Sequence, residues 1–271
     1  MVQLQGIKQW KRILLPYEQA VEELKVKFKS IRNELRDMNE YSPIEFVTGR
    51  VKKISSILEK ASRRNIREDR IEEEIEDIAG IRIMCQFVDD IYEVVDLIRK
   101  RNGKDLEIIY EKDYIKNNKE SGYRSYHVII RYPVQTALGE KNILAELQIR
   151  TLAMNFWATV EHSLNYKYKK NMPENIRTRL RKASEAAYQL DKEMYKIRNE
   201  IINAQKMFEE KSSNVYEISN NIQMLSLFGY KDEAREFQRK FDKLWKNGSL
   251  EEFQELSKTI KYAIQRYQAF D

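Results

Sequence analysis

The stretch NILAELQIR, which runs from Asn142 to Arg150, alternates polar and apolar side chains. Successive side chains of a β-strand point to opposite faces, so Glu146, Gln148 and Arg150 share one face and the apolar side chains between them share the other. Three strongly polar groups in the middle of a strand are not core residues. The stretch therefore predicts a sheet with one apolar face and one polar face.

Three other stretches predict further strands of this sheet. They are EFVTGRVK at residues 45–52, GIRIMCQF at 80–87 and YHVIIRY at 126–132. Arg82 and His127 stand opposite the apolar positions of their strands and would join the polar face if the faces coincide. An ordinary sheet with one face in water gives the same pattern. Ser42 and Glu45 also match a helix capping box, which favours a helix instead of the first of these strands.

Apolar residues at helical spacing mark most of the remaining chain. Helices are expected from Pro16 to Leu35, over residues 54–64 and 90–100, and from Thr151 onward, where a heptad seam runs from Ile176 to Phe208. The segment KSSNVYEISNN, residues 211–221, predicts a polar break. A capping box at Ser249 and Glu252 then begins another helix. The fold class is therefore α+β, a mixed sheet flanked by helices with a long helical C-terminal region.

Composition excludes several classes of protein. The 271 residues are 42% hydrophobic, which suffices for a core, and no stretch reaches the roughly 20 apolar residues of a membrane span. The N-terminus lacks the features of a signal peptide, so a cytoplasmic protein is expected. A single cysteine, Cys85, excludes an intramolecular disulfide, and two histidines without a cysteine pair argue against structural zinc. The net charge of +6 suits a phosphate-rich partner without requiring one.

Two carboxylates are candidates for metal binding. Asp77 ends the acidic run EEEIED just before the strand that contains Arg82, and Glu146 lies in the middle of its own strand. Two carboxylates among basic residues suit Mg²⁺ that bridges nucleotide phosphates. A solvated helix end is the ordinary explanation for the acidic run, so both interpretations stay open.

Basic and aromatic residues could complete a nucleotide site. Ser56 and Lys60 lie one helical turn apart and Arg63 follows, which suits a grip on phosphates but equally a solvated basic helix. In ESGYRSYH, Gly122 permits a tight bend and Tyr123 offers a platform for a base. A loop tyrosine is nevertheless more often a packing residue.

Four segments, in this order, resemble the small alarmone synthetases, the synthetase-only branch of the RelA/SpoT family, and most nearly their RelQ type. They are SPIEFVTGRVKKISSILEKA (residues 42–61), DIAGIRIMCQFVDDI (77–91), DYIKNNKESGYRSYHVII (113–130) and AELQIRTLAMNFWATVEHSLNYKYK (145–169). The resemblance covers about residues 8–210, and the linked segments are far more specific than any one of them. It implies the nucleotidyltransferase-like synthetase fold.

The resemblance also implies an activity, namely Mg²⁺-dependent transfer of pyrophosphate from ATP to the 3′-hydroxyl of GDP or GTP, which gives ppGpp or pppGpp and AMP. Asp77 and Glu146 would be the catalytic and metal-binding carboxylates, and Glu146 would also be the base. The residues implied for ATP are Arg50, Lys52, Ser56, Lys60, Arg63 and Arg82. Those implied for GDP or GTP are Lys119, Tyr123, His127, Gln148 and Asn155.

Regulation and assembly follow from the same resemblance. It implies a homotetramer with (p)ppGpp as an allosteric activator. The residues implied for the activator are Lys29, Arg32, Phe46 and Thr48. The chain has no His-Asp dipeptide, so synthesis without hydrolysis is expected. The expected divisions are a synthetase domain over residues 1–170, an oligomerisation helix over 171–212 and a helical hairpin of unassigned role over 213–271.

Two other functions remain as alternatives. A non-catalytic protein that binds single-stranded RNA or assembles through helices would use the basic surface and the heptad seam, but the carboxylates of Asp77 and Glu146 would repel RNA. Another nucleotidyltransferase would release pyrophosphate instead of AMP.

Overall fold

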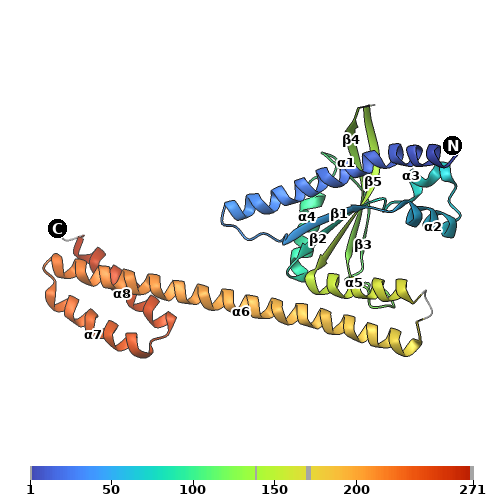
Figure 1. The fold of residues 1–271 in the computed structure, drawn as a ribbon. Helices are drawn as coiled ribbons and strands as arrows, with labels where there is room; N and C mark the ends of the chain where they lie inside the picture. Colours follow the sequence, from blue (N-terminus) through green and yellow to red (C-terminus); the bar gives the residue numbers. More distant parts are fainter. Residues whose placement is uncertain (1, 138, 169–171, 269–271) are drawn as a thin grey trace. The chain divides into compact units, whose positions relative to one another are not determined.

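The computed structural model describes residues 2–137, 139–168 and 172–268 (Figure 1). The chain divides into two compact units, Met1–Tyr195 and Lys196–Asp271. Each unit has a hydrophobic core of its own. None of the described helices is both long and apolar enough to span a membrane.

The first unit is built on a five-stranded mixed sheet with the strand order β1-β2-β5-β4-β3. Its strands are β1 (Phe46–Val51), β2 (Ala79–Cys85), β3 (Glu107–Asp113), β4 (Tyr126–Thr136) and β5 (Gly139–Thr151). β2 and β5 run parallel, and the other neighbouring pairs are antiparallel. The predicted mixed sheet is confirmed, and the segment after Ser42 begins a strand instead of a helix.

The edge strand β3 is the one strand that the sequence pattern did not indicate. Its side chains are exposed or half-buried, and its register with β4 shifts between Ile108 and Tyr110. An edge strand has a partner on one side only, so it needs fewer apolar side chains. Its pairing with β4 therefore depends on tertiary context.

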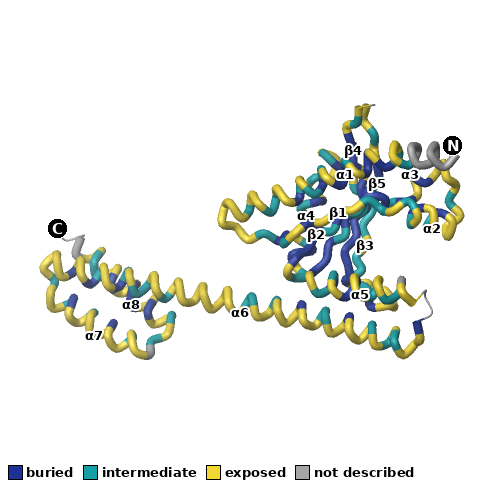
Figure 2. The backbone as a smooth tube through the Cα atoms, viewed as in Figure 1, coloured by how far each residue is buried: buried dark blue, intermediate teal, exposed yellow. Residues whose placement is uncertain are grey.

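Helices pack around the sheet of the first unit. They are α1 (Val2–Asp37), α2 (Ile54–Arg64), α3 (Ile71–Glu74), α4 (Val88–Arg99), α5 (Leu152–Lys167) and the beginning of α6 (Glu174–Leu227). α1 and α4 share one core with the apolar side chains of the strands, and α5 contacts β5 and β2. Figure 2 shows the buried residues concentrated along the strands.

Helix α1 begins earlier than the sequence predicts. The pattern places Pro16 in the first turn, but the structure has it inside the helix. Proline removes one backbone hydrogen bond from a helix interior. Leu14 is buried and Trp10 packs against the same core, so tertiary contacts stabilise the turns before Pro16.

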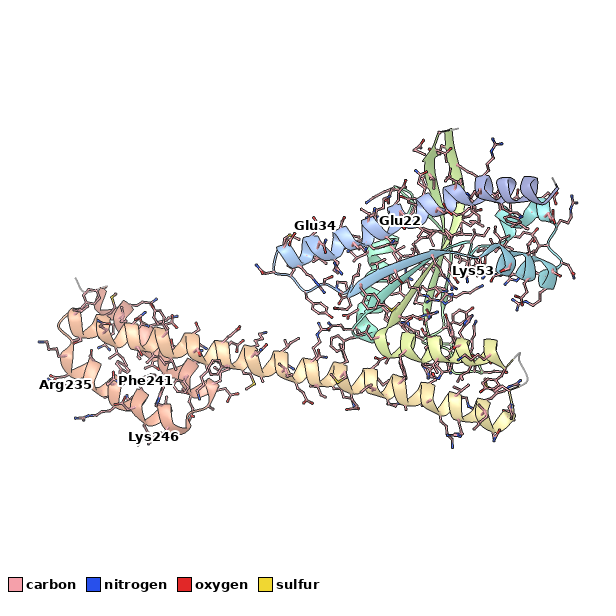
Figure 3. The ribbon with its side chains drawn as sticks, in the orientation of Figure 1. Glu22, Glu34, Lys53, Arg235, Phe241 and Lys246 are labelled. Atoms are coloured by element: carbon pink, nitrogen blue, oxygen red, sulfur yellow. The ribbon has the colours of Figure 1, made fainter. Side chains whose placement is uncertain are left out.

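The second unit contains the end of α6 together with α7 (Lys231–Asn247) and α8 (Leu250–Gln268). Its core includes Phe241 of α7, labelled in Figure 3, which meets Phe253 of α8 edge to face at 6.2 Å between ring centroids. Ser249 and Glu252 form the predicted capping box.

The polar break predicted at residues 211–221 is wrong, because α6 continues through it. Ile218 is fully buried and Ile222 nearly so, both in the core of the second unit. Two apolar residues one turn apart are a weak local signal among polar neighbours. Packing against α7 and α8 supplies what the local pattern lacks.

Candidate active site

The polar faces of four strands coincide on one side of the sheet. Gln148 of β5 lies opposite Arg82 of β2 and opposite His127 of β4. Thr48 of β1 pairs with Arg82, and Glu146 lies two residues before Gln148 on the same face of β5. The prediction of a shared polar face is confirmed by these registers.

Two cavities open on this face. The first has a volume of about 240 Å³ and is lined by Thr48, Gly49, Arg50, Asp77, Gly80, Arg82, Glu146 and Gln148. The second has about 400 Å³ and is lined by Arg50, Arg82, Lys119, Tyr123, Gln148, Arg150, Ala158, Thr159, Glu161 and His162. Arg50, Arg82 and Gln148 line both, so the cavities are neighbours that share part of one floor.

Asp77 lies two residues before the start of β2, and its carboxylate is between two lysines. Lys52 Nζ is 2.8 Å from one carboxylate oxygen, and Lys60 Nζ is 2.7 Å from the other. Burial by itself would raise the pKa of Asp77, but the two ammonium groups outweigh it and hold the pKa below its ordinary value. The carboxylate is therefore ionised at neutral pH.

Glu146 is largely buried, and both of its oxygens are engaged. Nδ1 of His127 lies 2.8 Å from Oε1, and the side-chain amide of Gln148 donates to Oε2 at 2.7 Å. Burial would raise the pKa of Glu146, and the charge of Asp77 adds to that effect. The His127 and Gln148 contacts outweigh both, so the pKa is lowered and the carboxylate stays charged.

Tyr123 closes a ring of hydrogen bonds with these groups. Its hydroxyl lies 2.7 Å from Nε2 of His127 and accepts from Nη2 of Arg150 at 2.5 Å. Arg150 also donates to Gln148 at 2.8 Å. Lys119 Nζ and the Arg150 guanidinium lie 5.0 and 5.1 Å from the centroid of the Tyr123 ring. The Lys119 and Arg150 cations thus lie over the Tyr123 ring, which is expected to stack on a guanine base.

The two arginines expected at adenine lie side by side on the sheet. Arg50 pairs with Gly80 in the β1–β2 register, two positions from the pair that contains Arg82. Burial lowers the pKa of Arg82, and the charges of Arg150 and Arg50 lower it further. The repulsion among these three guanidinium groups favours an anionic ligand, and the charge of Glu146 offsets part of that repulsion at Arg82.

Other predicted residues lie outside the lining of the two cavities. Ser56 is half-buried on α2, and Arg63 is exposed near the end of that helix. Asn155 on α5 has a buried Oδ1 without a hydrogen-bond partner among the described residues. Such an orphaned acceptor suits a ligand that donates a hydrogen bond.

The four residues expected at an allosteric site lie on α1 and β1. Arg32 donates to the backbone oxygen of Glu45 at 3.1 Å, and Lys29 is exposed. Phe46 is 38% exposed on β1. Thr48 instead lines the first cavity.

Arg150 is the principal site residue without a role from sequence reasoning. It is 4% exposed and joins Tyr123, Gln148 and Ser125. Alternation placed it on the polar face, and that signal was available. His162 and its neighbours on α5 carry no comparable signal, because only tertiary packing brings that helix to the second cavity.

The carboxylates of the first cavity fit a divalent cation. Asp77 and Glu146 line the same small space, and Mg²⁺ prefers one or two carboxylates with substrate oxygens. Within the described ranges there is no cluster of three or more acidic, histidine or cysteine ligands. The donor set therefore suits a metal that is bound together with its substrate.

Comparison with known proteins gives consistent matches. The region found in RelA and SpoT proteins matches residues 49–171. The GTP pyrophosphokinase YjbM of Bacillus subtilis is 59% identical over 204 residues, which cover 75% of this chain and 95% of the relative. The GTP pyrophosphokinase YwaC of the same organism is 40% identical over 197 residues, covering 72% and 93%.

Solved structures agree with these sequence matches. Small alarmone synthetase 1 from Bacillus subtilis, bound to its product pppGpp, matches with a TM-score of 0.68 and 59% identity over 72% of this chain and 98% of that one. A GTP pyrophosphokinase family protein from Streptococcus pneumoniae matches with a TM-score of 0.69 and 57% identity over 73% and 96%. With its two cavities on one polar sheet face, the chain therefore belongs to the RelA/SpoT family, among the small alarmone synthetases.

Proposed function

We propose that this chain transfers pyrophosphate from ATP to the 3′-hydroxyl of GDP or GTP and so makes ppGpp or pppGpp. The observation that carries the proposal is the pair of neighbouring cavities, one with the two carboxylates and one with Tyr123. Relatives are named GTP pyrophosphokinases, and similar structures hold pppGpp or AMPCPP. Two nucleotides in adjacent cavities are what such a transfer requires.

The chemical step forms one bond and breaks one. The 3′-oxygen of the acceptor attacks the β-phosphorus of ATP, and the bond between that phosphorus and the oxygen of the α-phosphate breaks, so that AMP leaves. Glu146 is charged at neutral pH and takes the proton of the 3′-hydroxyl. A positioned base contributes about 10² to 10⁴ in rate. Glu146 lies in the middle of β5, and this position limits the movement of its backbone.

The donor side of the site is built from cations. Arg50 and Arg82 would hold adenine through their flat guanidinium groups. Lys52 and Lys60 now neutralise Asp77 and lie where ATP phosphates would enter. Ser56 and Arg63 would make further contacts with the ATP phosphates. Positioning and electrostatic stabilisation dominate phosphoryl transfer, so such groups account for much of the catalysis.

Mg²⁺ would be held by Asp77 and Glu146 together with oxygens of ATP. When bound, it would offset negative charge on the phosphoryl oxygens during transfer. Lys52 and Lys60 could then move from the Asp77 carboxylate to the phosphates, because both hold that carboxylate only through their terminal ammonium groups.

The acceptor would occupy the second cavity. Tyr123 would stack on guanine. For this, either Lys119 or Arg150 would have to move away from one face of the Tyr123 ring. His127 and Gln148 hold Glu146 from both sides and so aim it at the acceptor hydroxyl. Asn155 would use its unpartnered Oδ1.

The assembly and regulation expected from the resemblance are part of this proposal. We place the synthetase domain in residues 1–170, an oligomerisation helix in 171–212 and an accessory hairpin in 213–271. Apolar residues that stay exposed on α6, among them Leu190 and Met194, support a homotetramer. The proposal includes activation by (p)ppGpp at a site formed by Lys29, Arg32, Phe46 and Thr48. It also includes a cytoplasmic location.

The test is to incubate the full chain with ATP, Mg²⁺ and GDP or GTP and to separate the nucleotides by anion exchange. AMP and a 3′-pyrophosphorylated guanosine should appear together and fall at least 10²-fold in Glu146→Gln. Glu107→Gln on β3 is the matched control, because it lies in an exposed ion pair with Arg131. Release of pyrophosphate in place of AMP, or no product even when pppGpp is added, would refute the proposal.

A further inference from the structure

The loop of residues 119–125 rests on helix α6. Ser184 Oγ donates to the backbone oxygen of Gly122 at 2.5 Å. Gly122 has a φ of +89°, and a Cβ there would lie 2.8 Å from Cβ of Ser184. The loop and the helix are therefore packed backbone to side chain with no room for a larger residue.

Arg124 makes the second contact between the loop and α6. It is 8% exposed and donates to Ser184 Oγ at 3.3 Å and to Glu185 at 2.8 Å. Its guanidinium lies 4.4 Å from the centroid of the Tyr188 ring. Ser184 accepts from Arg124 while it donates to Gly122, so one hydroxyl joins both contacts.

Adjacent residues of this loop face different surroundings. Tyr123 and Lys119 line the second cavity, whereas Arg124 lines neither cavity and contacts α6. Arg124 therefore does not act on a nucleotide directly. Its contacts with α6 limit the positions that Tyr123, the preceding residue, can take.

We propose that Arg124 and Ser184 are positioning residues for the acceptor nucleotide: their contacts hold the 119–125 loop on α6 so that Lys119 and Tyr123 face the acceptor. This inference rests on the proposed function. When the competent shape of a loop is only partly populated, apparent affinity falls by that fraction. A loop released from α6 would have to be ordered by the acceptor itself, at a cost in acceptor affinity alone.

The variants are chosen to separate positioning from folding. Arg124→Met keeps most of the aliphatic stem and removes the charged fork, Arg124→Lys restores a charge without the fork, and Ser184→Ala removes only the shared hydroxyl. Arg131→Met is the matched control, because Arg131 lies on β4 and its partner Glu107 is exposed. KM for each nucleotide, the melting temperature and hydrogen exchange of the loop amides are measured for all four.

In Arg124→Met and Ser184→Ala the acceptor KM should rise about tenfold while the ATP KM stays within twofold, with partial recovery in Arg124→Lys. Two backbone amide protons of the loop should exchange faster. They are that of Gly122, which donates to the backbone oxygen of Lys119, and that of Lys119, which donates to the backbone oxygen of Tyr123. Arg131→Met should match the wild type. Unchanged acceptor KM and loop exchange, or equal losses for both nucleotides with a lower melting temperature, would overturn the inference.

Exchange is measured without turnover, so the two proposals can fail separately. A wild type that makes no 3′-pyrophosphorylated guanosine refutes the proposed function, and with it the acceptor role of the loop. Slow, unaltered loop exchange in Arg124→Met refutes the α6 contact even in an active enzyme.

Discussion

At the scale of single residues, Glu146 on β5 and Asp191, which contacts the end of β5, have opposite electrostatic environments. Glu146 is surrounded by donors, and its pKa is lowered despite burial. Asp191 of α6 accepts one hydrogen bond, from Thr151 Oγ1 at 2.6 Å, and burial raises its pKa to about 6. Thr151 also accepts from the backbone NH of Met154 and so caps α5. Glu146 therefore stays charged at neutral pH, whereas Asp191 takes up a proton more readily than an ordinary aspartate.

Asp191→Asn should flatten the pH dependence of stability. A carboxyl whose folded pKa lies above its unfolded value of 3.8 binds more protons when folded, so its contribution is full below pH 4 and is lost as pH rises through about 6. Each pKa unit is worth about 1.4 kcal/mol, so the variant should gain on the order of 3 kcal/mol at pH 8 relative to pH 4.

Urea unfolding at pH 4, 6 and 8 measures this effect. Asp232→Asn is the control, because the Asp232 side chain is almost fully exposed in its ion pair with Arg235. A variant whose stability relative to the wild type is the same at all three pH values would contradict the assignment.

At the scale of elements, the site depends on how the helices and loops around the sheet are joined. α5 begins where β5 ends, with Thr151 as its N-cap, and Trp157 of α5 donates to the backbone oxygen of Leu180 at 2.8 Å. α6 in turn contacts the loop of residues 119–125 through Ser184, which bonds to Gly122 and Arg124. On the opposite face, α1 packs so close to β1 that a Cβ at Gly49 would lie 2.8 Å from Val21.

Gly49→Ala should destabilise the first unit by about 1–3 kcal/mol, because the new methyl group would overlap Val21 and Ile81 in a packed core. Gly80→Ala is the matched control on the neighbouring strand, where a Cβ meets only the backbone oxygen of Arg50 at an ordinary 3.8 Å. Chemical denaturation of both variants measures the difference. Equal stabilities would show that α1 can move away from β1 at small cost.

At the scale of the whole chain, two units have separate cores. The second core lies among the end of α6, α7 and α8, with Phe253 and Ile260 fully buried. Residues of the proposed active site all belong to the first unit. The second unit therefore has its own packing requirement, independent of the polar sheet face.

Phe253→Ala should destabilise the second unit by about 3–5 kcal/mol, the usual cost of truncating a buried phenylalanine. Basal synthesis should stay within twofold of the wild type. Hydrogen exchange resolved along the chain measures the loss of protection in α7 and α8, and Tyr262→Ala, at an exposed position of α8, is the control. Lost protection in β2 and β5 would contradict separate cores.

Local patterns were sufficient for much of the fold. Period-two alternation identified β1, β2, β4 and β5, and helical spacing identified α2 and α4 within one or two residues. Patterns failed at the edge strand β3, at Pro16 inside α1 and at the supposed break near Ile218. Each of these elements is stabilised by contacts with residues distant in sequence, which no short window contains.

The sequence by itself determined which residues could do chemistry, because a side chain's identity and its place in a strand follow from local covalent geometry. Tertiary structure decided which of them meet. The strand registers set Arg82 and His127 on either side of Gln148, and the packing of α6 separated Arg124 from Tyr123. Such encounters depend on the free energy of long-range packing, and that energy is a property of the whole chain.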